Sequence, residues 1–212
     1  MKLADIRTDY RQGKLRREDL KPDPIEMCNL WLDDAVRAGV IEPTAMSLAT
    51  AWKDGRPLLR TVLLKGLDAR GFVFFTNLES RKARQLSENP AVSLLFPWLA
   101  LERQLIVTGR AEKISAMESL KYFVTRPRES QLAAWASRQS SAISSRKVLE
   151  MEWEQIKAKF GAGKIPLPAF WGGYRVKPET IEFWQGGPNR LHDRFEYTRQ
   201  PDDSWVIARL AP

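Results

Sequence analysis

The chain has 212 residues, 43% of them hydrophobic and 28% charged, which suits a globular protein with one substantial core. Its single cysteine, Cys28, excludes an internal disulfide and fits a reducing compartment. The first 20 residues contain no apolar run, and no apolar run anywhere approaches the roughly 18 residues of a membrane span. The sequence therefore predicts no secretory signal, no membrane helix and a cytoplasmic location.

The net charge of +8 predicts anionic partners, either nucleic acid or small phosphorylated molecules. Apart from the pair Arg16-Arg17, the basic residues are spread singly through strand-like and helix-like segments. Nucleic-acid binding typically needs a clustered basic patch or stripe. The distribution therefore favours small phosphates bound in pockets.

The N-terminal part of the chain predicts an arm followed by a helix. Residues 1–21 are polar and charged and are expected to be a mobile arm. Asp23 is a favourable N-cap, Pro24 suits the first helical position, and Glu26 completes a capping box. This helix ends at Gly39. Cys28 lies on its apolar side and is predicted to be a small core residue rather than a nucleophile.

From residue 44 the pattern changes to strands, and later to a helical block. Strands are predicted over 44–52, 58–66, 72–77, 91–98 and 102–114, with one short helix over 80–88 that Ser80 caps. Helices are predicted within 115–160, and further strands over 170–178, 179–186, 191–199 and 204–212. Consecutive strands with short connections predict an antiparallel sheet or small barrel decorated by helices, not a doubly wound fold. Residues 22–212 are expected to form one domain.

The only histidine, His192, lies between Arg190 and Arg194 and follows a turn over residues 186–189. If this segment is a strand, the three side chains share one face. Such a face is a poor core face because unpaired buried charge is costly, so it is either an anion site or a solvated edge strand. Trp184, just before the turn, could form a wall against an aromatic ligand.

Several familiar kinds of site are not supported. One histidine, one cysteine and no clustered carboxylates cannot build an ordinary zinc or iron site, so no metal is expected. The chain has no G-x-S-x-G elbow, no GxGxxG and no GxxxxGK[ST] motif. Hydrolase and nucleotide triphosphatase functions are therefore disfavoured.

Three other groups of residues could bind phosphate. Arg60 and Lys65 lie on opposite faces of a regular strand, so they could contact two different anions unless a bulge brings them together. Ser80, Arg81 and Lys82 begin a helix, where free backbone N–H groups favour anions, although a solvated helix start is the commoner meaning. Tyr122, Arg126 and Ser130 recur every four residues, but Pro127 places Ser130 in the first turn of the next helix. These three form either a phosphate cradle or a polar surface around a helix kink.

Longer stretches resemble the pyridoxamine 5′-phosphate oxidase family. The similarity covers nearly the whole chain from about residue 7, and its most specific parts are RPRESQ at 126–131 and WQGGPNRLHDR at 184–194. The other matching stretches, in chain order, are RTVLLK (60–65), FFTNLESRKA (74–83), NPAVSLLFPW (89–98), ERQLIVTG (102–109), YFVTRPRESQLAAW (122–135), RQSS (138–141), PAFWGGYRV (168–176) and IEFWQGGPNRLHDRF (181–195).

The resemblance implies a split β-barrel homodimer that binds FMN across the subunit interface and oxidises pyridoxamine and pyridoxine 5′-phosphates with O2. The C-terminal segment, about 170–212, would contribute to dimerisation and to the substrate site. By position, the FMN-binding residues would be Arg60, Thr61, Val62, Leu63, Leu64, Lys65, Phe75, Thr76, Arg81, Lys82, Gln104, Gln139, Ser140, Trp184 and Arg194. The substrate phosphate would contact Lys65, Tyr122, Arg126 and Ser130, and the pyridine ring would contact Arg190, Leu191 and His192.

Within this resemblance, Arg190 and His192 are the catalytic candidates. Arg190 would hold the substrate ring against the flavin, and His192 would adjust the charge of the pyridine's phenolic oxygen. Arg7 and Tyr10 match an N-terminal segment that closes over the site in some members, although this chain reads RTDY where relatives read RREY. Phe75 stands where relatives often carry tyrosine, which removes one hydroxyl contact.

Two other functions are weighed against this one. A flavin-dependent reductase or oxidase on the same barrel would act on a different substrate and would be expected to lack Tyr122, Arg126 and Ser130 as a set. A basic module without catalytic activity would bind nucleic acid with a steep salt dependence, or carry pyridoxal phosphate.

Overall fold

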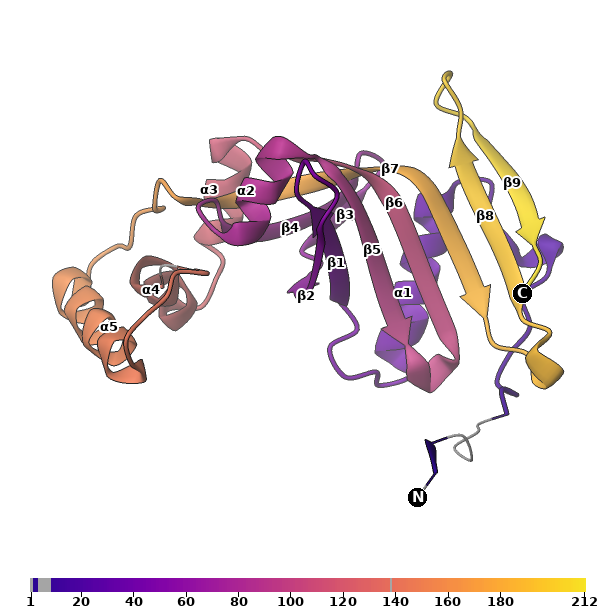
Figure 1. Ribbon diagram of the computed structural model, residues 1–212, viewed down its shortest axis with the longest axis horizontal. Coiled ribbons are helices and arrows are strands. Elements are labelled where there is room, and N and C mark those ends of the chain that lie inside the picture. Colours follow the sequence, from indigo (N-terminus) through magenta and orange to yellow (C-terminus); the bar gives the residue numbers. More distant parts are fainter. Residues whose placement is uncertain (1, 4–8, 138) are drawn as a thin grey trace.

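In this computed structural model, residues 2–3, 9–137 and 139–212 are described, and they form a nine-stranded antiparallel sheet with helices around it (Figure 1). The mainly β architecture predicted from the sequence is confirmed. The strands are β1 (Ala45–Ala51), β2 (Pro57–Leu63), β3 (Gly66–Asp68), β4 (Gly71–Asn77), β5 (Ala91–Trp98), β6 (Arg103–Lys113), β7 (Trp171–Gln185), β8 (Asp193–Arg199) and β9 (Trp205–Leu210).

The long strand β7 organises the sheet. Along one edge it pairs with β6, from Tyr174 to Gln185, with a register shift at Gly109. Its other edge pairs first with β4, through residues 171–176, and then with β8, through residues 180–185. The order β2-β1-β5-β6-β7-β4-β3 therefore curls at one end into a half-barrel, while β8 and β9 extend the other end.

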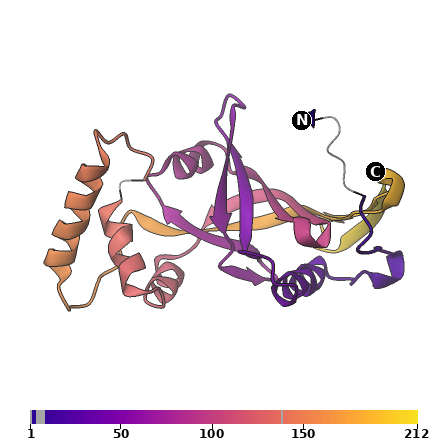
Figure 2. The same ribbon diagram turned by 90° about the horizontal axis from the view of Figure 1, so that it is seen from below.

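The helices lie mostly at the periphery. Asp23 accepts the Ile25 N–H at 2.9 Å and Ser80 accepts the Ala83 N–H at 3.4 Å, so both predicted N-caps are confirmed. Figures 1 and 2 both place α4 and α5 at one end of the molecule and β8 and β9 at the other. The helices are α1 (Pro24–Arg37), α2 (Arg81–Glu88), α3 (Ala116–Phe123), α4 (Arg128–Ala136) and α5 (Arg146–Phe160), and the 3-10 helices are η2 (Arg17–Asp19), η3 (Leu99–Leu101) and η4 (Pro188–Arg190).

Two hydrophobic clusters hold the fold together. The larger one joins the concave side of the sheet to α1 and includes Cys28, which is buried as predicted, with a pKa that burial raises well above its usual value. The smaller cluster lies under α3–α5 around Phe123 and Trp171. Trp171 begins β7, so it connects the helical end of the molecule to the sheet. The positions of α3–α5 therefore depend on β7, which also extends to the opposite end of the molecule.

Three details of the predicted strands were wrong. The strand predicted over 58–66 is β2, which ends at Leu63, and Gly66 begins a separate strand, β3. The strands predicted over 170–178 and 179–186 are one continuous β7, because Pro178 lies at the β-bulge opposite Gly109. A Cβ at Gly109 would collide with the Lys177 carbonyl oxygen, so glycine permits the close approach that accommodates the proline. The strand predicted over 191–199 begins only at Asp193.

The N-terminal arm was expected to be mobile. Arg7 lies outside the described residues. Residues 9–21 run along the sheet, where Leu15 is 4% exposed in the large core cluster and the Lys21 carbonyl accepts the Tyr197 hydroxyl at 2.7 Å. In the described ranges, no helix is both long and apolar enough to cross a membrane. The predicted cytoplasmic location stays a prediction.

Candidate functional site

A cavity of about 350 Å³ opens between β2, β4, α3 and α4. A second hollow adjoins it beside β2 and the start of α2, and the two share Thr61, Lys82 and Gln139. Lys65 lines the first hollow and Arg60 lines the second. The two cations predicted to lie on opposite faces therefore line different but adjoining hollows. Most residues predicted from the strand over 60–65 are thus brought to one place.

Lys82 connects the two hollows through a small hydrogen-bonded group. Its ammonium donates to the Thr76 hydroxyl at 3.1 Å and to the Gln139 side-chain oxygen at 2.8 Å. The Thr76 hydroxyl also donates to Gln139 at 2.9 Å. Thr76 lies on β4, Lys82 in the first turn of α2, and Gln139 after α4. Two consecutive elements, β4 and α2, therefore meet the distant Gln139 at a cation that has no carboxylate partner among the described residues.

The Arg60 side chain is fixed from the sheet side. Its Nη1 donates to the Leu48 carbonyl at 3.0 Å and to the Thr50 hydroxyl at 2.6 Å, and its Nη2 donates to Gln85 Oε1 at 3.2 Å. Thr50 and Gln85 are fully buried and bond to each other at 2.6 Å. Neutral oxygens, rather than carboxylates, therefore orient this guanidinium and leave its charge uncompensated.

The second hollow is strongly cationic. Burial, with a further contribution from Arg60, lowers the pKa of Lys82 to about 8. Burial and the nearby Arg81 lower the pKa of Arg60 as well. No ion pair joins these three cations to a carboxylate within the described part of the chain. Desolvation and mutual repulsion make this arrangement costly without an anion, so the hollow fits a phosphate.

The first hollow combines aromatic walls with a buried guanidinium. Phe75 stacks on Tyr122 at 4.1 Å and on Trp171 at 5.2 Å between ring centroids. The Arg126 guanidinium lies 4.8 Å from the centre of the Trp171 ring, and its buried Nη1 has no hydrogen-bond partner among the described residues. Burial lowers the pKa of Arg126, and burial raises that of Tyr122. An unpartnered buried N–H on a cation indicates a site for a second anion.

The remaining residues predicted near these hollows are placed as follows. Ser130 is half-buried in the first turn of α4, as predicted, but it does not line the cavity. Leu64 is 5% exposed and packs in the large core cluster, so its side chain faces away. Val62 and Leu63 line the first hollow, and Arg81 and Ser140 line the second.

A second cluster of predicted residues lies on the C-terminal half of β7 and beside it. Gln104, Trp184 and Arg194 are paired in register across β6, β7 and β8, so they form one row on the same face of the sheet. Arg194 is bound to Glu182 at 2.7 Å, which raises the pKa of Arg194. His192 lies against Trp184, with 4.6 Å between ring centroids.

The expectation that Arg190, His192 and Arg194 share one face of a strand was wrong. Arg190 is the last residue of η4, with φ at 62°, and only Arg194 belongs to β8. Arg190 and Leu191 are exposed, whereas Asp193 accepts the Leu15 N–H at 3.1 Å. The strict alternation of a strand does not apply because the Gly-Gly-Pro turn continues into a 3-10 helix.

The His192 imidazole has one nitrogen already engaged. The Gly187 backbone N–H donates to His192 Nδ1 at 3.1 Å. Nδ1 is therefore an acceptor, and in the neutral ring the proton is on Nε2. This arrangement leaves Nε2–H as the donor of the neutral ring.

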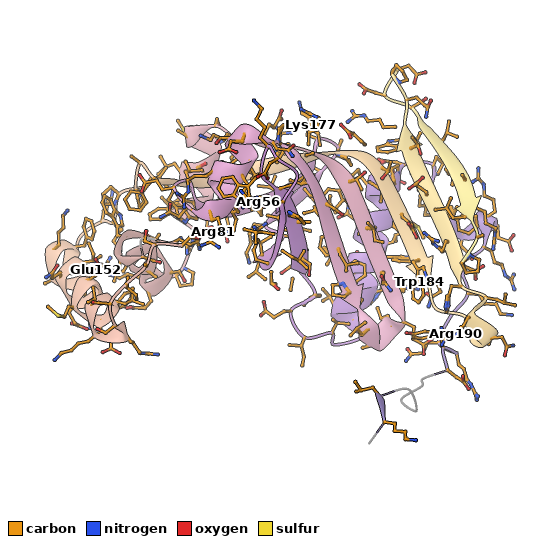
Figure 3. All side chains as sticks on the ribbon, in the orientation of Figure 1. Arg56, Arg81, Glu152, Lys177, Trp184 and Arg190 are labelled. Atoms are coloured by element: carbon orange, nitrogen blue, oxygen red, sulfur yellow. The ribbon has the colours of Figure 1, made fainter. Side chains whose placement is uncertain are left out.

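The two clusters lie far apart in one chain. Figure 3 labels Arg81 beside the helical end of the sheet, and Trp184 and Arg190 at the opposite end. Neither hollow is lined by any of Gln104, Trp184, Arg190, His192 or Arg194. A single ligand therefore cannot contact both clusters of the same chain.

Several residues of the site were not singled out from the sequence. Thr50 and Gln85 orient Arg60, Asn77 lines the first hollow, and Trp171 forms its aromatic wall. A fifth, Glu102, contacts the N-terminal segment. Asn77, Glu102 and Trp171 lie inside stretches that match the family, whereas Thr50 and Gln85 carried no signal. The others act through contacts between elements that periodicity does not reveal.

Comparisons with known proteins cover the full chain. A family described as pyridoxamine 5′-phosphate oxidase matches residues 32–160, and the C-terminal dimerisation region of pyridoxine 5′-phosphate oxidase matches residues 171–212. Pyridoxine/pyridoxamine 5′-phosphate oxidases from Vibrio vulnificus and Teredinibacter turnerae are 59% and 61% identical over 212 residues, with 100% of both chains covered.

Among solved structures, PhzG from Burkholderia lata, determined with tetrahydrophenazine-1-carboxylic acid, has a TM-score of 0.87 at 33% identity and covers 92% of this chain and 95% of its own. An FMN-binding protein from Nostoc punctiforme has a TM-score of 0.72 at 17% identity, covers 91% of this chain and 100% of its own, and shows the shared fold alone. The split-barrel fold predicted by resemblance is confirmed.

Proposed function

The chain belongs to the pyridoxamine 5′-phosphate oxidase family, and we infer that it is an FMN-dependent oxidase that converts pyridoxamine and pyridoxine 5′-phosphates into pyridoxal 5′-phosphate. The observation that carries this function is the pair of adjoining hollows, each with cations that no described carboxylate neutralises. A reaction between a phosphorylated cofactor and a phosphorylated substrate needs two such anion sites side by side.

The cofactor phosphate occupies the hollow beside α2. Arg60, Arg81 and Lys82 supply its positive charge, and Thr61, Gln139 and Ser140 add polar contacts at the same hollow. Thr76 accepts a hydrogen bond from Lys82. The α2 N-terminus favours an anion there as well. When bound, FMN supplies the redox chemistry, accepting a hydride from the substrate and passing electrons to O2 to give H2O2.

The substrate phosphate occupies the hollow lined by Lys65, Tyr122 and Arg126. The unpartnered Arg126 Nη1 then acquires an acceptor, which removes the cost of its burial. Holding the phosphate in this hollow orients the rest of a small substrate, because both ends of the reacting pair are then anchored. Ser130 is a more distant contributor from the first turn of α4.

We propose that each active site is completed by the partner subunit of a homodimer. The chain carries the family's C-terminal dimerisation region, and Trp184, Arg190, His192 and Arg194 all lie within it. These residues are remote from the hollows of their own chain, so in a symmetric dimer they face the hollows of the other. Residues 22–212 then act as one domain, of which about 170–212 serves the partner's site.

In this arrangement the C-terminal cluster contacts the ring end of both ligands. Trp184, Gln104 and Arg194 form a continuous row that suits the flavin, and Arg190 and His192 meet the substrate. Arg190 is exposed and has no partner among the described residues, so its guanidinium is available to cover a pyridine ring. His192 offers its Nε2–H as a donor to the phenolic oxygen, because Gly187 occupies Nδ1.

The oxidase function is tested with purified protein. The protein is expected to be yellow, and to consume O2 and form pyridoxal 5′-phosphate with pyridoxine or pyridoxamine 5′-phosphate. A colourless protein that FMN does not reconstitute contradicts the function. Pyridoxine without its phosphate serves as the comparison substrate, and a KM no higher than that of the phosphorylated form would favour a relative acting on another substrate.

A further inference from the structure

Glu102, at the turn between η3 and β6, contacts the N-terminal segment with its carboxylate. Its side chain is almost fully buried, and Oε2 accepts the backbone N–H groups of Arg11 at 2.7 Å and Gln12 at 2.9 Å. No described cation forms an ion pair with this carboxylate. The two backbone N–H donors therefore stabilise the buried carboxylate, since charge-assisted hydrogen bonds are stronger than neutral ones.

These two bonds place Tyr10, the preceding residue, against the C-terminal cluster. The Tyr10 ring meets Trp184 edge-on at 5.7 Å and His192 at 5.5 Å between centroids. Gly186 permits this approach, because a Cβ there would lie 2.8 Å from Tyr10 Cγ. The N-terminal segment therefore packs directly on the residues that meet the substrate.

Glu102 also contacts the turn that carries those residues. Its backbone carbonyl accepts the Gly186 N–H at 2.7 Å, and the next glycine, Gly187, donates to His192. Glu102 itself adopts a left-handed conformation, with φ at 53° and ψ at 37°. A residue other than glycine, asparagine or aspartate seldom adopts this conformation, which indicates that its contacts hold it there.

We propose that Glu102 is a positioning residue for the oxidation, a role that rests on the proposed function. Its carboxylate holds residues 10–12 so that Tyr10 covers the Trp184–His192 surface, and its backbone fixes the turn beneath. A covered surface excludes water from the substrate side of the site and restricts the imidazole to one orientation. The effect is expected on substrate binding, because Tyr10 lies against His192, which meets the substrate in the proposed site.

The test uses the FMN-loaded enzyme with Glu102→Gln, which removes the charge, and Glu102→Asn, which shortens the side chain and tolerates the left-handed backbone. For both variants, KM for pyridoxine 5′-phosphate is expected to rise about tenfold while kcat stays within about twofold. Trypsin cleavage after Arg11, followed by mass spectrometry, is expected to accelerate about tenfold, because the bond is released from the sheet. The FMN Kd is expected to stay at the wild-type value.

Glu112→Gln is the matched control. Glu112 is an exposed glutamate on β6, the strand that follows Glu102, and its side chain forms an ion pair with Lys177. It is expected to change neither KM nor the cleavage rate. Variants of Glu102 that keep wild-type KM and cleavage would overturn the proposal. So would an equal loss of FMN binding, because that shows a general disturbance of the fold. The cleavage readout does not need catalysis, so it still reports on Glu102 if the oxidase function itself is wrong.

Tyr10 supplies a second line of evidence through a double-mutant comparison. If Glu102 acts through Tyr10, then Glu102→Gln is expected to add less than about twofold to the KM of Tyr10→Ala. If the KM increase of the double variant equals the product of the two single-variant increases, Glu102 does not act through Tyr10 and the proposal is overturned. Gly186→Ala disturbs the same contact, because the added Cβ collides with the Tyr10 ring. It is expected to raise KM and to accelerate tryptic cleavage after Arg11.

Discussion

The two ends of this molecule treat charge in different ways. At the helical end, Arg60, Lys82 and Arg126 are partly buried and have no carboxylate partner among the described residues, and burial lowers the pKa of each. At the C-terminal end, Arg194 is neutralised by Glu182, and Asp193 pairs with Arg209. The helical end therefore has the properties expected of an anion site, whereas the C-terminal end is a stabilised surface that presents aromatic and hydrogen-bonding groups.

This contrast supports the proposal that one chain carries halves of two different sites. An anion cavity needs unsatisfied positive charge, which is tolerable only where a ligand will supply the counter-charge. A contact surface must instead be stable before its partner arrives. The following predictions use this contrast, beginning with the largest expected effect.

Arg190→Ala tests whether the C-terminal end serves the substrate rather than the cofactor. Turnover is expected to fall about 100- to 1,000-fold, because the guanidinium no longer holds the ring in a reactive position. The FMN Kd, measured by quenching of flavin fluorescence, is expected to change less than about threefold. Equal losses in turnover and FMN binding would show that Arg190 belongs to the cofactor site.

Arg126→Ala tests the anion site at the other end. KM for pyridoxine 5′-phosphate is expected to rise about 100-fold, since a buried charge-assisted contact to phosphate is lost. The KM for unphosphorylated pyridoxine is expected to change little. Lys121→Ala, an exposed cation on the same helix as Tyr122, is the control and should retain wild-type kinetics. A KM increase of the same size for both substrates would contradict phosphate binding by Arg126.

Mixed dimers of these two variants test whether each site combines both ends across subunits. Alone, each variant is nearly inactive at low substrate concentration. After unfolding and refolding together, about half of the dimers contain one of each chain, and each of these has one intact site if sites are shared. Activity is therefore expected to recover to about one quarter of wild type. No recovery, with mixed dimers verified by differential tagging, would place each site within one chain.

The pH dependence of FMN binding tests the cationic hollow. Burial lowers the pKa of Lys82 to about 8, and a phosphate dianion binds the protonated ammonium. The phosphate is a dianion only above about pH 6. Because the free protein loses the Lys82 proton as pH rises through about 8, affinity is expected to be flat between these two values and to fall above the higher one. The slope is at most about tenfold per pH unit. Lys82→Arg stays charged and is expected to abolish the slope, whereas an unchanged slope would assign it to another group.

Gln85→Leu is expected to have the smallest effect. It removes one of the acceptors that orient Arg60 but leaves those from Leu48 and Thr50. The FMN Kd is expected to rise about fivefold while KM for the substrate is unchanged. Ser87→Ala, an exposed change on the same helix, is the control. If Arg60→Ala weakens FMN strongly but Gln85→Leu does not weaken it at all, the proposed orientation of Arg60 by Gln85 is wrong.

Much of the secondary structure followed from local rules. Asp23 and Ser80 start their helices where capping chemistry predicts, and the β4, β5 and β6 bounds agree closely with the apolar runs. The continuity of β7 did not follow, because Pro178 is acceptable only opposite the bulge that Gly109 permits on the neighbouring strand. A local rule cannot anticipate what a partner strand provides.

The sequence alone was enough to predict the mainly antiparallel fold, the buried role of Cys28, the family resemblance and the candidate phosphate-binding residues, since each depends on residue type and short spacing. Only the tertiary structure decided which of those residues meet. It joined Lys82 to Thr76 and Gln139, brought Glu102 to the N-terminal segment, and placed Arg190 and His192 outside the strand. It also separated the two clusters along β7, because a strand of 15 residues extends too far for both its ends to reach one ligand.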